Sequence, residues 1–261
     1  MDLKLANKVA LVVASSQGLG KAVATQLVKE GTNVMITSRN AEKLQAVKEE
    51  LTALQAGSVE YYPADITKVE DIKALVAKTR EVFGKIDILV NNAGGPPGGT
   101  FDQFSDEDWQ KAFELNLFSY IRMIREVLPD LKQEGGKIIN IASSSIKQPI
   151  SGLILSNTFR TGIVGLAKSL AEELAPYNIL VNTVAPGRIY TDRIEYLDQL
   201  KAERLQITVD EVQEQALKSI PLARFGTPEE FANVVTFMAS EASSYVTGSS
   251  IIVDGGSVKS I

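Results

Sequence analysis

Two kinds of segment alternate along the chain. Short runs of aliphatic and β-branched residues predict strands, and longer segments with apolar residues every three or four positions predict helices. The predicted strands are residues 9–13, 33–37, 58–62, 86–90, 137–141, 179–184 and 250–253. The predicted helices are residues 18–30, 41–54, 69–83, 106–131, 153–175, 209–218 and 228–240. Thr227, Pro228 and Glu230 form a capping box at the start of the last helix.

This alternation indicates a parallel sheet with right-handed crossovers. The strand segments are apolar at nearly every position, which suits strands that helices cover on both faces. No internal repeat and no linker rich in proline, glycine or serine divides the chain. We therefore predict a single domain over residues 1–261, an α/β fold with a Rossmann-like, doubly wound parallel sheet of about seven strands.

The regular pattern breaks over residues 188–221, a charged stretch that we predict to be partly helical. Loops at the carboxyl ends of strands often close over substrate, so we expect this stretch to be a substrate-loop region together with residues 95–99. The Gly-Pro-Pro-Gly-Gly sequence at 95–99 fits an inert tight turn equally well. Arg188, Arg193 and Arg204 stand among acidic residues, which indicates a solvated helical face and identifies no substrate.

Residue counts exclude several classes of site. The 261 residues include no cysteine and no histidine, so disulfides, thiolate nucleophiles and a Ser-His-Asp device are excluded, and we predict no metal site. Any general acid or base must then be a carboxylate, a lysine, a tyrosine or a hydroxyl relay. A net charge of −5 and the lack of basic runs argue against nucleic-acid binding.

The apolar segments also argue against a membrane. Residues 1–8 are mixed in charge and lack the apolar core of a signal peptide. The longest apolar stretches, such as residues 9–14, are far shorter than the ~20 residues of a spanning helix. We expect a cytoplasmic protein without membrane association.

A glycine-containing turn follows the first strand and leads into a helix. It reads Ala14-Ser15-Ser16-Gln17-Gly18-Leu19-Gly20. Glycines let the backbone approach a pyrophosphate, whose charge lies at the helix N-terminus. An ordinary strand-to-helix turn would also explain two glycines. Further small or polar residues follow other strands, where open parallel sheets bind ligands: Asp65-Ile66, Asn91-Asn92-Ala93-Gly94 and Pro186-Gly187. The combined pattern predicts a dinucleotide site.

The end of the second strand indicates which dinucleotide binds. A carboxylate there would bind the ribose hydroxyls of NAD and repel the 2′-phosphate of NADP. This chain has Thr37-Ser38-Arg39-Asn40, without an acid. The Arg39 guanidinium suits a phosphate and Ser38 adds a hydroxyl, although a solvated surface arginine is an alternative. We therefore predict NADP(H) in preference to NAD(H).

These residues resemble, in order and spacing, those of the short-chain dehydrogenase/reductase family, nearest to its 3-oxoacyl-carrier-protein reductases. The resemblance covers nearly the whole chain and includes residues beyond the turn: Asn116, Ser143, Thr247-Gly248 and Asp254-Gly255-Gly256. It implies an oxidoreductase that interconverts a carbonyl and an alcohol on a small molecule, and it adds Ile189 and Thr191 to the coenzyme site. One departure is Val13-Ala14, where the family has Thr-Gly; alanine is small enough to keep the turn.

The resemblance also implies catalytic positions. Ser143 matches the serine that bonds the reacting oxygen, and Asn116 matches the asparagine that holds a proton-relay water. Thirteen residues beyond Ser143 the family has Tyr-x-x-x-Lys, whose tyrosine is the acid/base and whose lysine holds the nicotinamide ribose. This chain has Ser156 and Arg160 at those positions, and the pattern that follows from Gly162 stays in register. We interpret the difference as a substitution.

The substitution changes what the site can do. Positions i and i+4 share a helix face, so we expect Ser156 and Arg160 to point together at the site. Arginine can hold ribose hydroxyls, but it cannot release a proton. Serine is a much weaker acid than a phenol, and loss of a positioned acid/base lowers rates roughly 10²–10⁴-fold.

Three interpretations follow. In the first, the protein still reduces a carbonyl or oxidises an alcohol with another proton donor, such as Tyr190, which could equally be a loop aromatic packed on the substrate lid. In the second, Ser156 and Arg160 form a different site for an anionic or unusual substrate. In the third, the protein is a catalytically impaired sensor that binds a dinucleotide or ligand on the same fold.

Family resemblance further implies a homotetramer built from the fourth and fifth helices and the C-terminal helix and strand. The fifth helix is apolar over much of its surface, with residues such as Ile163, Val164 and Leu166. A helix apolar beyond one stripe lies either in the core or at an interface. We therefore expect a homo-oligomer.

Overall fold

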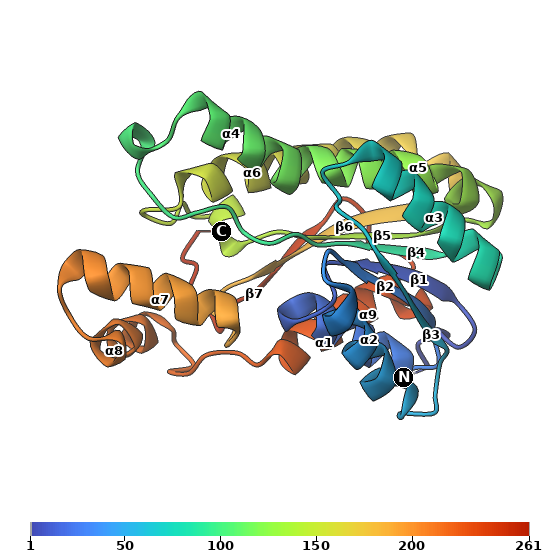
Figure 1. Cartoon of the computed structure of the whole chain (residues 1–261), viewed down its shortest axis with the longest axis horizontal. Coiled ribbons are helices and arrows are strands. Elements are labelled where there is room, and N and C mark those ends of the chain that lie inside the picture. The colour runs from blue at the N-terminus through green and yellow to red at the C-terminus, as the bar shows by residue number, and fades with distance from the viewer. Residues whose placement is uncertain (1, 261) are drawn as a thin grey trace.

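The computed structural model describes residues 2–260, and within them the chain forms one seven-stranded parallel sheet (Figure 1). Met1 and Ile261, the ends of the predicted domain, lie outside the described residues. The strand order is β3-β2-β1-β4-β5-β6-β7. The strands are β1 (Val9–Val13), β2 (Asn33–Ser38), β3 (Val59–Pro63), β4 (Ile88–Asn91), β5 (Gly136–Ile141), β6 (Ile179–Pro186) and β7 (Ser250–Val253).

Helices cover both faces of the sheet, as predicted. In Figure 1 α1, α2 and α9 lie below the sheet and α3, α5 and α6 lie above it. The helices are α1 (Gly18–Lys29), α2 (Ala41–Thr52), α3 (Val69–Phe83), α4 (Asp106–Phe113), α5 (Ser119–Glu134), α6 (Ile154–Glu173), α7 (Asp192–Leu205), α8 (Val209–Ser219) and α9 (Pro228–Ala239).

The two layers explain why the strands are apolar at every position. In β1, Ala10 and Val12 face the cluster formed with α1 and α9, whereas Leu11 and Val13 face the cluster formed with α3, α5 and α6. All five residues of β1 are buried. Successive side chains of a strand point to opposite faces, so a strand between two apolar layers has no polar side.

The predicted helix over residues 106–131 is wrong as a single element. A π-helical turn, η2 (Glu114–Phe118), separates α4 from α5. Asn116 lies at its centre, fully buried, and its Nδ2 donates to Ala112 O at 3.3 Å. Asparagine competes with the backbone for such carbonyls, and π-turns of this kind are frequent at functional sites.

Residues 188–221 contain two helices, α7 and α8, which project at the left of Figure 1 beyond the carboxyl end of β6. The predicted helix 209–218 is confirmed as α8, and α7 is the helical part that the sequence left undefined. Arg193 of α7 donates from Nη2 to Pro96 O at 2.6 Å. This contact ties residues 188–221 to the glycine-rich segment 95–99.

Candidate active site

The turn after β1 forces the chain into a conformation that suits glycine. Ala14 has a φ of 51° and Gly18 a φ of 57°, so both lie in the left-handed region. A Cβ on Gly20 would lie 2.2 Å from Ala14 O, which only glycine can tolerate. The turn therefore brings α1 against the end of β1, with its first N–H groups open at the carboxyl edge of the sheet.

Within residues 2–260, no side chain caps or neutralises the N-terminus of α1. Gln17 is the N-cap residue but makes no side-chain capping bond, and the first turn contains no acid. Side-chain caps are present on α2, α4, α8 and α9, whereas α3, α5, α6 and α7 lack one as α1 does. Free N–H groups and the helix dipole together make such a terminus a ready binding position for phosphate.

Polar side chains hold the turn in place. Ser15 is fully buried; its Oγ donates to Val12 O at 2.8 Å and accepts from Thr37 N at 2.9 Å. Asn92 Nδ2 donates to Ala14 O at 3.3 Å. Ser15 and Asn92 thus fix the backbone, while the side chains of Ser16, Gln17 and Leu19 stay partly or fully exposed.

Arg39 and Asp65 form the outer end of the predicted coenzyme site. Arg39 is exposed and makes no ion pair or hydrogen bond within residues 2–260. Partial burial of the Asp65 carboxyl is outweighed by hydrogen bonds from Thr67 and by the charges of Arg39 and Lys68, so its pKa lies below the usual value. Lys43 Nζ, which sequence reasoning missed, donates to Gln17 Oε1 at 2.8 Å and brings a second cation to this end.

The ends of β4 and β6 complete this edge. A Cβ on Gly94 would meet nothing within 4 Å, so the segment opens to solvent there. Gly187 lies close to Asp254, and Thr191 Cγ2 lies 3.9 Å from a Cβ position on Gly18. Thr191 therefore lies next to the turn of residues 14–20. Ile66 and Ile189 are buried in the two apolar clusters, and Pro186 is half-buried.

Arg160 is buried beneath the carboxyl ends of β4 and β5. Its Nη1 donates to Ile141 O at 2.8 Å and to the Tyr120 hydroxyl at 2.9 Å, and its Nη2 donates to Ala93 O at 3.1 Å. The side chain thus joins the ends of β4 and β5. Three of its five N–H donors are used, and the buried Nε has no partner within residues 2–260.

Ser156, one turn before Arg160, is in a different state. It is buried, yet its hydroxyl makes no hydrogen bond within the described part of the chain. The short helix after Ser143 and the π-turn around Asn116 both pack against α6. Ser143 Oγ accepts from Ser145 N at 3.2 Å, and the buried Asn116 Oδ1 has no partner in residues 2–260. The segments that contain Asn116 and Ser143 thus both pack against α6, the helix of Ser156 and Arg160.

Tyr190 lines a groove that contains none of these four residues. The groove is open, has a volume of about 500 Å³ and lies between α1 and the start of α9, where Gly18 and Thr191 also line it. Its side chain is about half exposed, and a hydrogen bond with the Glu195 carboxylate raises the pKa of its phenol. A phenol with a raised pKa is a weaker acid near neutral pH.

Comparison with known proteins identifies the family. A family profile described as enoyl-(acyl carrier protein) reductase matches residues 13–258. The 3-oxoacyl-[acyl-carrier-protein] reductase FabG of Aquifex aeolicus (strain VF5) is 37% identical over 257 residues, which cover 98% of this chain and 99% of that protein. The chain belongs to the short-chain dehydrogenase/reductase family. It is therefore an oxidoreductase of that type in sequence and fold.

Two further members of the short-chain dehydrogenase/reductase family cover the chain. The NADPH-dependent reductase BacG of Bacillus subtilis (strain 168) is 34% identical over 259 residues, 98% of this chain and 100% of that protein. The crystal structure of L-sorbose reductase from Gluconobacter frateurii, complexed with NADPH and L-sorbose, superposes with a TM-score of 0.94 at 32% identity and covers 100% of both chains. The predicted fold is confirmed.

Sequence reasoning missed Tyr120 at this site. The side chain is 1% exposed, its hydroxyl donates to Ile141 O at 2.8 Å, and burial raises its pKa even though the Arg160 guanidinium opposes the shift. Tyr120 is the phenol bonded to Arg160, but its proton is held by a carbonyl away from solvent. Its position one turn beyond Asn116 was the only signal in the sequence.

The helices and the acidic side chains of the described residues bear on two other kinds of site, a membrane span and a metal centre. Across residues 2–260, no helix combines the length and apolar character needed to cross a membrane. The same residues contain no group of three or more Asp or Glu side chains placed to hold a metal ion.

Proposed function

We propose that this protein is an NADP(H)-dependent oxidoreductase that interconverts a carbonyl and an alcohol at an atypical active site. The observation that carries the coenzyme assignment is the open N-terminus of α1, without a cap or an acid, beside the close approach of Gly20 to Ala14 O. Relatives described as NADPH-dependent, and a related reductase complexed with NADPH, support the same coenzyme.

The residues present fit such a coenzyme. The backbone of residues 14–20 would hold the pyrophosphate, and the exposed Arg39 and Ser38 would bind a 2′-phosphate that an acid there would repel. Despite partial burial, hydrogen bonds from Thr67 lower the pKa of the Asp65 carboxylate, which would accept a bond from the adenine amino group. Asn92, Ala93, Gly94, Pro186, Gly187, Ile189 and Thr191 would line the remaining length. When bound, the coenzyme supplies or accepts a hydride.

The atypical feature is the pair Ser156 and Arg160, which stands where the family resemblance predicts tyrosine and lysine. Ser143 and the free hydroxyl of Ser156 would bind the substrate oxygen. Arg160 keeps a positive charge under that oxygen, but three of its donors already serve Ile141 O, Ala93 O and Tyr120. An aliphatic hydroxyl is too weak an acid to replace a phenol, so proton transfer has to run through water held near Asn116.

Restoring the pair tests this assignment. We expect Ser156→Tyr combined with Arg160→Lys to raise NADPH-dependent carbonyl reduction by roughly 10²–10⁴-fold, the contribution of a positioned acid/base. The assay is single-turnover oxidation of NADPH with a panel of small ketones and β-keto esters. Ser156→Ala is the matched control, because it changes the same position without adding a phenol.

A second function is favoured by one observation: Arg160 is tied to the protein's own carbonyls. A protein that binds the dinucleotide without turnover would need no free cation at that position. If the double variant binds NADPH but gains no activity, the substrate pocket is remodelled and the sensor function is preferred. Tyr190→Phe tests whether Tyr190 is the proton donor, because unchanged turnover of this variant would exclude that role.

We further propose that residues 188–221 form the substrate lid over residues 95–99 and that the protein is a homotetramer. The Arg193–Pro96 hydrogen bond supports the first proposal. For the second, all four residues of the edge strand β7 are only partly buried, although three are Ile251, Ile252 and Val253. Unpaired apolar edge strands are normally covered. Sedimentation or light scattering measures the assembly.

A further inference from the structure

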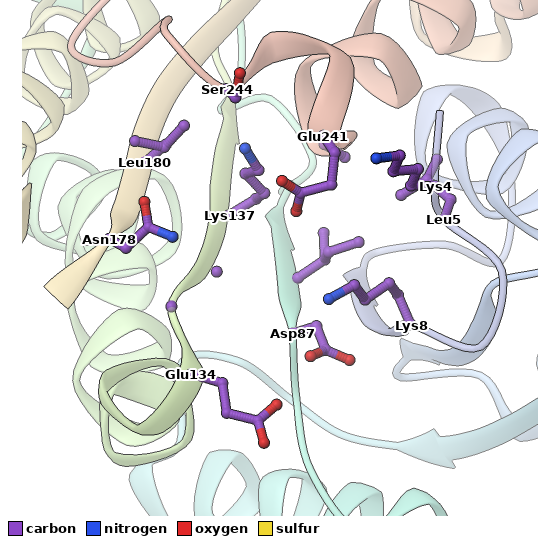
Figure 2. Close-up of a pocket in the computed structure, with 14 residues that line it drawn as sticks. Lys4, Leu5, Lys8, Asp87, Glu134, Lys137, Asn178, Leu180, Glu241 and Ser244 are labelled. Atoms are coloured by element: carbon purple, nitrogen blue, oxygen red, sulfur yellow. The ribbon is translucent and has the colours of Figure 1, made fainter. Parts of the chain in front are cut away.

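A cavity of about 140 Å³ lies at the amino ends of the strands, whereas the proposed coenzyme site lies at their carboxyl ends (Figure 2). Its walls come from the segment before β1, the first residues of β4, β5 and β6, and the end of α9. The proposed function uses none of these residues. Figure 2 shows several lysines and carboxylates around the opening.

Lys137 is the unusual residue of this cavity. Its side chain is 7% exposed, and within residues 2–260 no carboxylate lies within 4.0 Å of its ammonium and no hydrogen bond satisfies it. Burial lowers the pKa of Lys137, an effect that Glu241 opposes and Lys8 reinforces. Buried lysines are normally paired, because an isolated ammonium is costly to desolvate. Within residues 2–260 this ammonium makes no ion pair, although the charge of the Glu241 carboxylate acts on it.

Two of the three carboxylates that line the cavity are already engaged by Lys85. Lys85 Nζ holds both Asp87 Oδ1, at 3.1 Å, and Glu134 Oε2, at 2.6 Å. Asp87 Oδ2 accepts from Val9 N at 2.8 Å. Asp87 and Glu134 are thus engaged before any bond to Lys137 can form.

Two more lysines face the same space. Lys4 and Lys8 line the cavity from the segment before β1, and neither makes an ion pair within residues 2–260. Glu241 is the remaining lining carboxylate, and it too is unpaired in that part of the chain. Three free lysines therefore face one free carboxylate. Asn178 and Ser244 add an amide and a hydroxyl that can donate.

We propose that this cavity binds a small free oxyanion of the phosphate type, with the Lys137 ammonium as its central donor and Lys4 and Lys8 as flanking cations. An oxyanion offers several acceptor atoms, so one ion can bridge ammonium groups that otherwise repel one another. The cavity admits such an ion but not a nucleotide. Binding would join the N-terminal segment to β5 and stabilise the fold, because a ligand that prefers the folded state raises its stability.

The test is a titration of inorganic phosphate against chloride at constant ionic strength, followed by calorimetry and by Tm. We expect saturable binding that Lys137→Met weakens at least tenfold and Lys8→Gln weakens severalfold. Lys137→Met should also remove most of the rise in Tm that phosphate causes in the native protein. Lys8→Gln keeps the test decisive if Lys137→Met does not fold, since Lys8 is only partly buried.

Two control variants locate the ion. Lys111→Met alters an exposed α4 lysine paired with Glu107 and should leave phosphate affinity unchanged. Arg39→Gln should also leave it unchanged, because Arg39 belongs to the coenzyme end. Loss of binding with Arg39→Gln but not with the Lys137 and Lys8 variants would place the ion at the coenzyme site and overturn the proposal. An equal response of the native protein and both cavity variants would overturn it as well. These outcomes do not depend on NADPH binding.

Discussion

The turn of residues 14–20 and the proposed catalytic centre lie at the carboxyl ends of the strands, but they depend on different features of the chain. The turn is shaped by its backbone, through Gly18, Gly20 and a left-handed Ala14. The proposed catalytic centre depends on the side-chain chemistry of Ser156 and Arg160. A backbone site tolerates many substitutions as long as its turns survive, whereas one changed side chain alters which proton transfers are possible. Coenzyme binding and turnover can therefore be separated in this fold.

The largest effect is expected at the catalytic centre. Arg160→Ala leaves Ala93 O without its Arg160 donor, removes one of the two donors to Ile141 O and the donor to the Tyr120 hydroxyl, and opens a cavity. We therefore expect the free energy of unfolding to fall by at least about 3 kcal/mol. Denaturant unfolding measures it. Ser156→Ala is the matched control and should cost under about 1 kcal/mol, because the Ser156 hydroxyl has no partner. Equal effects would contradict the structural role of Arg160.

Gly20→Ala tests whether the turn depends on backbone approach. The added Cβ would meet Ala14 O at 2.2 Å and Asn92 Nδ2 at 2.9 Å. We expect a loss of about 2 kcal/mol in stability and at least a tenfold loss of NADPH affinity. Gly165→Ala, on α6 with nothing within 4 Å of its Cβ, should instead gain up to about 1 kcal/mol. Unchanged NADPH binding in Gly20→Ala would show that the turn is not the phosphate site.

Arg39→Gln changes the coenzyme end through charge alone. Arg39 has no partner within residues 2–260, so its loss should barely alter stability. We expect NADPH affinity to fall about tenfold, since one charge-assisted phosphate contact contributes roughly 1.5–3 kcal/mol, and NADH affinity to stay unchanged. Competition calorimetry with the two coenzymes measures the ratio. A parallel loss for both would assign Arg39 to general steering.

The smallest effect is expected for Ala14→Gly. A non-glycine residue in the left-handed region destabilises the folded state by roughly 1–2 kcal/mol. Glycine removes this strain, but it also increases the conformational entropy of the unfolded chain, which offsets part of the gain. We therefore expect a gain of up to about 1 kcal/mol in unfolding free energy, with NADPH affinity equal or slightly tighter. A clear destabilisation would mean that packing of the Ala14 methyl against its apolar neighbours contributes more stability than the strain at a φ of 51° removes.

Much of the fold could be predicted from the sequence. The apolar runs define β1 and β7 at their observed bounds, and Thr227 caps α9 as predicted. The bounds of α7 were not predicted, because charged residues lie on all sides of this helix and leave only a weak apolar stripe. The π-turn at Asn116 was missed for another reason: widening a helix by one residue leaves the hydrophobic period nearly unchanged.

Ser156 and Arg160 lie on one helix, α6, as predicted, but the direction of the Arg160 side chain could not be predicted. The spacing of Ser156 and Arg160 correctly puts them on one helix, one turn apart. It cannot reveal that the guanidinium turns inward to Ile141 O and Ala93 O, because rotamers depend on acceptors that other strands supply. Tyr120 was invisible for the same reason, since its partners are 21 and 40 residues away in the chain.

Calorimetric titration of NADPH into the native protein is the decisive measurement, because it asks whether the proposed coenzyme site, formed by residues 14–20 with Arg39, binds the coenzyme. We predict one site per chain with a dissociation constant in the micromolar range, and weaker binding of NADH. Absence of detectable NADPH binding by a folded protein would contradict the account, whatever the fate of its catalytic centre.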